Sequence, residues 1–129
     1  MSTPGIRISD AEWQVMNVLW RQSPLTAREV VAALGDDTGW HPKTVRTLLG
    51  RLVKKKALTF EEDGHLYRYS PAVRREECVE REGRSFVERV FGGDRHSLLL
   101  HFARRADLSQ EEADELRRIL DGADEGSER

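Results

Sequence analysis

The sequence predicts a mainly α-helical fold with one small β-hairpin. Three segments begin with a Ser or Thr that is followed three residues later by Glu, the capping-box pattern of a helix N-terminus; they start at Ser9, Thr26 and Ser109. The pair Asp63-Gly64 separates two short β-prone runs, which is a strong hairpin signal. At 129 residues, the chain is expected to be one domain, or a small domain with an appendage.

The composition excludes several classes of protein. Apolar residues make up 38% of the chain and charged residues 34%, which is typical of a helical protein with a thin core or of one that completes its core by dimerising. No apolar run approaches the roughly 18 residues of a membrane-spanning helix, and the N-terminus lacks the apolar segment of a signal peptide. We therefore expect a cytoplasmic protein without membrane insertion. The single cysteine, Cys78, excludes an intrachain disulfide and a cysteine-based metal cluster.

The helices of the first half follow from caps and apolar spacing. The first is expected from about Asp10 to Arg21, and the second from Ala27 to Leu34 with Gly35 as its stop. A third is expected to begin at Pro42, because the missing amide of proline costs nothing at the first helical position. Together with the hairpin that follows, this is the element order of a winged helix-turn-helix, expected over residues 1–72.

The second half is predicted to be helical. Apolar residues recur at helical spacing up to the pair Gly92-Gly93, and the last helix is expected to start at the Ser109 cap. We expect a helical dimerisation region over residues 73–122 and a disordered tail over residues 123–129.

The segment from Trp40 to Leu58 holds six Lys or Arg residues and no carboxylate, in a chain of formal net charge -2. Such a local patch, rather than the net charge, decides whether a polyanion can bind. A helix of this kind can enter the major groove of DNA, where Arg and Lys pair with guanine and Thr methyl groups touch thymine. A solvated helix face is the alternative, but the position after two helices and before a hairpin favours a recognition helix. On a helical wheel, the side opposite the apolar residues carries Lys43, Thr44, Arg46, Thr47, Gly50, Arg51 and Lys54.

Four segments of the sequence resemble a known protein family, and the resemblance covers about residues 6–121. They are ISDAEWQVMNVLW, SPLTAREVVAAL, WHPKTVRTLLGRLVKKKAL and the Gly-x-x-Tyr-x-Tyr of residues 64–69. In these segments the chain resembles the penicillinase-repressor family (BlaI/MecI type). The resemblance implies a homodimeric winged-helix transcriptional repressor that binds double-stranded, palindromic operator DNA with half-sites of the TACA/TGTA kind.

Roles in the recognition helix can be assigned. Thr47 and Arg51 are predicted to read bases, whereas Lys43 and Thr44, at the helix N-terminus, are predicted to meet phosphate or the first base edges. The three lysines at positions 54–56 are expected to attract phosphate. The full set predicted to bind DNA is His41, Lys43, Thr44, Arg46, Thr47, Arg51, Lys54, Lys55, His65 and Arg68.

The chain departs from the family pattern in two places. His41 stands where the family usually has Ser, so we expect a weaker helix cap and a contact of His41 with phosphate. The wing is acidic at residues 61–63, where wings that face DNA are usually neutral or basic. His65 and Arg68 are the candidates there for a contact with the DNA backbone, and plain surface positions are the alternative.

The second half carries apolar stripes but too little chain to cover them. We expect these stripes to pack against a second copy of the chain, because a two-fold dimer would present two recognition helices to two half-sites. A compact monomer with a helical cap is the alternative. The residues expected at the dimer contact are Val79, Phe86, Val90, Leu98, Leu99, Phe102, Leu116, Ile119 and Leu120.

The resemblance also bears on how the protein is switched off. Relatives that answer β-lactams are inactivated by a membrane-bound sensor metalloprotease that cuts an Asn-Phe bond in this region. The matching bond is His101-Phe102, which keeps the Phe and lacks the Asn. The C-terminal cysteine motif of the copper-responsive relatives is missing. Cys78 is expected to be inert packing or a surface thiol, with redox sensing as the alternative.

Other functions remain as alternatives. The sequence has no phosphate loop or nucleophile elbow, and His96 and His101 do not share one helix face, so we expect neither an enzyme nor a bound metal or cofactor. Two further alternatives keep the winged helix. One is a docking module whose basic face binds an acidic protein, and the other is a regulator gated directly by a small ligand.

Overall fold

The computed structural model describes residues 6–127, with side chains up to residue 122. The chain forms two compact units that divide between Gly83 and Arg84. The predicted boundary lies earlier, at residue 72; the first unit extends farther because Val73 and Cys78 are buried in its core. Within residues 6–127, no helix is both long and apolar enough to cross a membrane.

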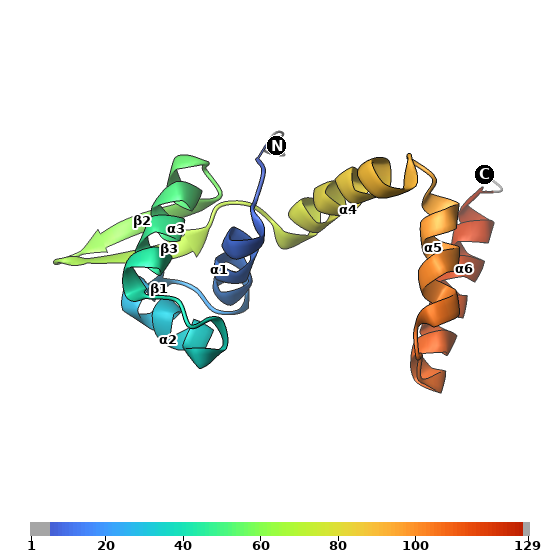
Figure 1. The fold of residues 1–129 in the computed structure, drawn as a ribbon, viewed down its shortest axis with the longest axis horizontal. Helices are drawn as coiled ribbons and strands as arrows, with labels where there is room; N and C mark the ends of the chain where they lie inside the picture. The colour runs from blue at the N-terminus through green and yellow to red at the C-terminus, as the bar shows by residue number, and fades with distance from the viewer. Residues whose placement is uncertain (1–5, 128–129) are drawn as a thin grey trace. The chain divides into compact units, whose positions relative to one another are not determined.

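The first unit combines three helices with a small antiparallel sheet. Its elements are, in order, α1 (Asp10–Arg21), β1 (Leu25–Thr26), α2 (Ala27–Thr38), α3 (Pro42–Lys54), β2 (Leu58–Asp63) and β3 (Leu66–Pro71). The three helices contact one another, and the strand order is β1-β3-β2. The β2–β3 hairpin extends away from the helices as a wing (Figure 1). This arrangement confirms the predicted winged helix-turn-helix.

The capping boxes predicted at the first two helices are present. The Ser9 hydroxyl accepts a hydrogen bond from the Glu12 amide at 3.2 Å, and the Glu12 carboxylate accepts one from the Ser9 amide at 2.9 Å. Thr26 and Glu29 make the same reciprocal pair at 3.2 and 2.9 Å. These bonds satisfy amides that a helix N-terminus otherwise leaves unpaired, which explains why both starts could be read from sequence.

The end of α2 is confirmed in part, since the regular helix is interrupted at Gly35 as predicted but the element continues beyond it. At Gly35 the backbone leaves the helical region (φ 60°, ψ -156°), but a further turn follows and the helix ends at Thr38. Gly39, in the left-handed conformation (φ 64°), is its C-cap. Gly35 therefore bends the helix, and the next glycine in the sequence ends it, since both positions need the positive φ that glycine adopts without strain.

The hairpin is confirmed, with its turn one residue later than the predicted pair. Asp63 still pairs with Leu66, so the turn consists of Gly64 and His65, with Gly64 at φ 66°. A third strand, β1, pairs antiparallel with β3 and was not predicted. Two residues are too few for any period-two pattern to show in the sequence.

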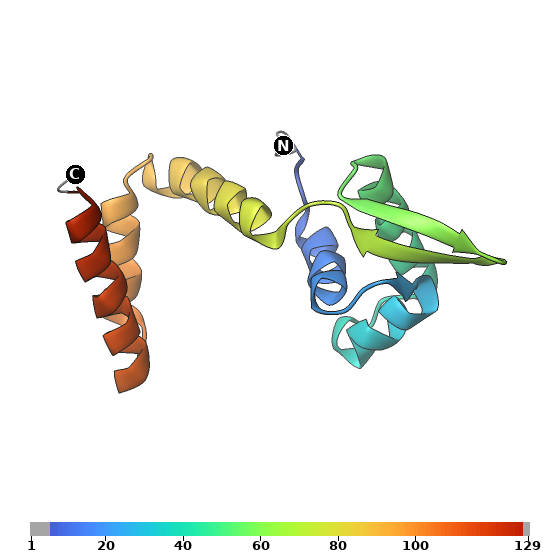
Figure 2. The ribbon, with the colours of Figure 1, turned by 180° about the vertical axis from the view of Figure 1, so that it is seen from behind.

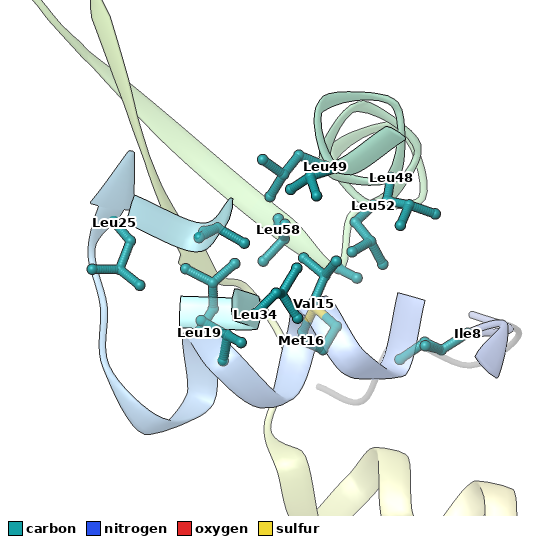
Figure 3. Packing of buried hydrophobic residues seen from close by; sticks show 14 of the residues in the cluster. Ile8, Val15, Met16, Leu19, Leu25, Leu34, Leu48, Leu49, Leu52 and Leu58 are labelled. Atoms are coloured by element: carbon teal, nitrogen blue, oxygen red, sulfur yellow. The ribbon is translucent and has the colours of Figure 1, made fainter. Parts of the chain in front are cut away.

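The core of the first unit lies between the three helices and the base of the sheet. Val15, Met16 and Leu19 of α1 pack there with Leu49 and Leu52 of α3, all fully buried (Figure 3). These apolar residues recur every three or four positions, which places them on the inward face of each helix. The core therefore fixes which face of α3 points outward.

The turn after α3 contains a backbone strain that can be tested. Lys56 has a φ of 69°, the left-handed region that a residue with a Cβ adopts at a cost. We expect Lys56→Gly to raise the free energy of unfolding by about 0.5–1 kcal/mol, because the relieved strain exceeds the extra backbone entropy of glycine. Urea denaturation would measure this change. Lys56→Ala removes the same charge but keeps the Cβ, so a gain in that variant would contradict the strain as the cause.

The second unit and the segment of chain that leads into it are helical. The elements are α4 (Arg75–Phe91), which crosses the boundary between the units, α5 (Arg95–Arg105) and α6 (Gln110–Ser127). The Ser109–Glu112 capping box is present at the start of α6, as predicted, and α5 and α6 run in opposite directions (Figure 2). No residue from 84 to 122 is buried. The second unit thus has no core of its own within that range.

The structure continues α6 to Ser127, into the segment predicted to be a disordered tail from residue 123. Gly122 has no positive φ, so it does not make the left-handed turn that would end the helix. The helix therefore extends over residues 123–127 of the segment expected to be a disordered tail, and residues 128–129 lie outside the described part of the chain.

Candidate nucleic-acid interface

The exposed face of α3 carries the candidate interface. Its inward face is buried through Val45, Leu48, Leu49 and Leu52. The opposite face is exposed to solvent, as the helical wheel predicts. In the described part of the chain, the salt bridges leave the four cations on this face unpaired. Those residues are Lys43, Arg46, Arg51 and Lys54.

The start of α3 is capped by His41. Its Nδ1 accepts a hydrogen bond from the Lys43 amide at 3.0 Å, and Pro42 takes the first helical position. The amides of Thr44 and Val45 bond to the His41 carbonyl oxygen at 2.9 and 3.3 Å. His41 therefore caps α3 through its imidazole ring, at the position where the sequence predicts a weaker cap. Because these first amides already have partners, binding of an anion here depends on side chains and on the helix dipole.

Thr47 lies at the centre of the exposed face with its hydroxyl already engaged. The Oγ1 donates to the Lys43 carbonyl oxygen at 3.0 Å. The hydroxyl proton is therefore used within the helix, which leaves the methyl group and the oxygen lone pairs for an outside partner. A thymine methyl is the base group that suits such a side chain best.

Lys55 does not join the unpaired cations of α3. Its ammonium binds the Glu12 carboxylate at 2.5 Å and the Arg7 carbonyl oxygen at 2.7 Å. Glu12 is only 1% exposed. Burial raises the pKa of this carboxyl group, but the hydrogen bonds from Lys55 and Ser9 and the charge of Lys55 outweigh burial and lower it. We infer that Lys55 holds α1 against the end of α3, in contrast to its predicted role at phosphate.

The wing candidates are placed differently from one another. His65 is exposed in the hairpin turn. The Arg68 guanidinium is shared between two carboxylates, Asp63 at 3.3 Å and Glu29 at 3.9 Å. These contacts already offset part of its charge, so His65 is the freer of the two.

A groove beside α3 is lined in part by residues that the sequence did not indicate as site residues. It has a volume of about 600 Å³, and it lies between the start of α2, the exposed face of α3 and the wing. Arg28 of α2 faces it together with Arg46 of α3, and Tyr67 and Tyr69 of the wing supply aromatic walls. The alternation in Tyr-x-Tyr could have indicated that both tyrosines share one face of β3. Nothing local connects Arg28 with α3.

The other predicted site residues serve packing or lie on the surface. Cys78 is buried, and burial raises the pKa of its thiol, so its environment favours inert packing over redox sensing. His101 and Phe102 are exposed neighbours in α5, and the His101 ring also lies near Phe91. Within the described residues, no group of three or more His, Cys, Asp or Glu side chains is placed to hold a metal ion.

Three helices, a hairpin wing and an uncovered basic face on the third helix define a winged helix-turn-helix DNA-binding protein. The chain belongs to the penicillinase repressor family, since the profile of that family, described as "Penicillinase repressor", matches residues 8–122. This confirms the family that the sequence motifs indicate.

Individual relatives agree over nearly the whole chain. The penicillinase repressor of Bacillus licheniformis is 38% identical over 115 residues, 89% of this chain and 90% of that protein. The methicillin resistance regulatory protein MecI of Staphylococcus aureus is 35% identical over 120 residues, 93% of this chain and 98% of that protein. The solved DNA-binding domain of the repressor BlaI is similar in fold, with a TM-score of 0.52 and 38% identity over 60% of this chain and 93% of that one.

Proposed function

We propose that this protein is a sequence-specific transcriptional repressor that binds palindromic operator DNA as a homodimer in the cytoplasm. The observation that carries the proposal is the outward face of α3, where four cations form no salt bridge in the described chain and the inward face anchors the helix in the core. Half-sites of the TACA/TGTA kind are the operators that the family resemblance implies.

The geometry of α3 suggests how the operator is read. Lys43 and Thr44 stand at the helix start, where the dipole favours phosphate, and their side chains supply the contacts. Thr47 and Arg51 follow at intervals of about one turn and can both face base edges when α3 lies in the major groove. Arg46 borders the groove shared with the wing, and Lys54 at the far end adds attraction to phosphate.

The second unit supports the dimer. Large apolar side chains of α5 and α6 are exposed, including Leu99, Phe102, Ile119 and Leu120, and no residue between 84 and 122 is buried. An apolar surface of this kind is covered in a stable protein, and a second copy of the same unit offers a matching surface. The dimer would then deliver two copies of α3 to two half-sites.

We also propose that a membrane-bound protease inactivates the repressor by cleavage in the second unit. The bond between His101 and Phe102 lies inside α5, and both residues are exposed. A helical peptide bond is presented for cleavage only after local unwinding. Cleavage there would separate α6 from the rest of the chain and remove part of the apolar surface that supports the dimer.

Fluorescence anisotropy with a TACA/TGTA palindrome and a scrambled duplex tests the proposal. We expect Arg51→Ala to weaken binding to the palindrome by about 1–3 kcal/mol and to reduce the preference over the scrambled duplex, because a lost base contact lowers specificity. Arg74→Ala, which removes an arginine paired with Glu76 outside α3, is the matched control and should bind normally.

The outcomes separate the alternatives. Equal binding of the natural chain to both duplexes would rule out the TACA/TGTA operator class. Binding to neither duplex at low salt would contradict the repressor assignment and favour a module that docks an acidic protein.

A further inference from the structure

Gly50 lies in the interior of α3, and the fold gives no reason for it. Glycine is the least favourable residue in a helix interior after proline. Its φ at this position is not positive, and a Cβ added there would meet no atom within 4 Å. Alanine would therefore fit the chain and favour the helix, so a reason for the glycine lies outside the chain.

The surroundings of Gly50 show which outside partner is relevant. Residues three and four positions apart are neighbours on a helix surface, so Arg46, Thr47 and Lys54 surround Gly50. All three are exposed. Gly50 is thus a notch in the middle of the basic face, the surface that we assign to operator DNA.

The missing side chain at Gly50 matters because Thr47 can contact a base only when the helix backbone lies close to it. Its side chain is short, and its hydroxyl donates to the Lys43 carbonyl oxygen. Arg51 can reach a base from a distance, but Thr47 contacts one only if the backbone of α3 lies close to the base pairs. A side chain at position 50, one turn farther along the same face, would hold the helix away from them.

We propose that Gly50 is a specificity-determining residue, whose missing side chain lets α3 approach the major groove closely enough for the Thr47 methyl group to contact a thymine methyl. The inference rests on the proposed function. It adds that the preference read at Thr47 depends on Gly50, although Gly50 itself makes no side-chain contact.

The test uses the full chain and an operator that the natural protein selects from a randomised duplex library. We expect Gly50→Ala to raise the melting temperature but to weaken operator binding about fourfold or more, because it removes at least the one methyl contact of Thr47. Gly122→Ala is the matched control, because Gly122 is also an exposed helical glycine with open space around it, in the second unit. That control should be more stable and should bind normally.

Thymine-to-uracil replacement in the selected operator provides a second readout. Removing one thymine methyl at the position read by Thr47 should weaken the natural chain about fourfold, the effect of one buried methyl group. Gly50→Ala should not respond to the same replacement. Operator binding by Gly50→Ala that equals the natural chain, or a natural chain insensitive to every replacement, would overturn the inference. A natural chain that selects no sequence would remove the proposed function, and the inference with it.

Discussion

Ile119→Asp is expected to convert the protein to a monomer and to weaken operator binding about a hundredfold to ten-thousandfold, the range in which linking two binding modules raises avidity. Ile119 is 59% exposed and lies on one stripe of α6 with Leu116 and Leu120. If this stripe is the dimer contact, the substitution places an unpaired carboxylate in an apolar interface, which costs several kcal/mol. Sedimentation velocity at micromolar protein would measure the association, and anisotropy the binding.

Arg118→Asp is the control for this experiment. Arg118 is exposed on the opposite face of α6, about half a turn from the apolar stripe. That variant should remain dimeric and bind the operator normally. A dimeric Ile119→Asp protein would show that α6 does not form the contact, and a monomeric natural chain would contradict the dimer altogether.

Elements specified by local chemistry could be predicted from the sequence. The start of α1 follows from the capping box at Ser9, and the orientation of α3 follows from Pro42 and the spacing of its apolar residues. Each of these signals acts within about one turn of helix, so it is visible in a short stretch of sequence. The same locality explains why the two-residue strand β1 was missed, since β3 creates it by pairing from far along the chain.

The candidate site shows the same limit. The wheel correctly placed the unpaired cations of α3 on its exposed face, but the prediction that the lysines at positions 54–56 attract phosphate did not distinguish Lys54 from Lys55. Lys55 has a partner, Glu12, that lies 43 residues away. The capping box at Ser9 already accounts for Glu12 in the sequence. Because this local role is sufficient, nothing in the sequence indicates that Glu12 also forms an ion pair with Lys55. The groove formed by Arg28 and the wing likewise depends on tertiary packing.

Lys55→Met is expected to lower the free energy of unfolding at pH 7 by about 2–3 kcal/mol. Removing one partner of a fully buried ion pair costs about 3–5 kcal/mol, because the other charge is left without compensation. The Lys55 side chain is 35% exposed, so solvent reduces this figure. Chemical denaturation would measure the loss. Glu12→Gln together with Lys55→Met should recover part of it, because glutamine keeps an acceptor for the Ser9 amide and carries no charge.

Lys54→Met is the matched control, and DNA binding separates the two lysines. Lys54 is exposed and unpaired in the described chain, so its loss should leave stability nearly unchanged and reduce the slope of log affinity against log salt by about 0.9 for each phosphate contact. The properly folded Lys55→Met protein should keep the natural slope. A reduced slope for Lys55→Met would show that Lys55 binds phosphate after all.

The pH dependence of stability tests the same ion pair. The pKa of Glu12 in the folded protein is lower than its ordinary value of 4.5. A lowered pKa means that the carboxylate stabilises the fold above pH 4.5, and that this stabilisation is lost as the pH falls through the folded pKa. In Lys55→Met the ammonium no longer opposes burial, and only the Ser9 hydrogen bonds do, so the pKa of Glu12 is higher than in the natural chain and its carboxylate contributes less stability at neutral pH. The difference in unfolding free energy between the natural chain and Lys55→Met should therefore widen between pH 4 and pH 7. A difference independent of pH would indicate that the lysine stabilises α1 and α3 through packing of its apolar stem alone.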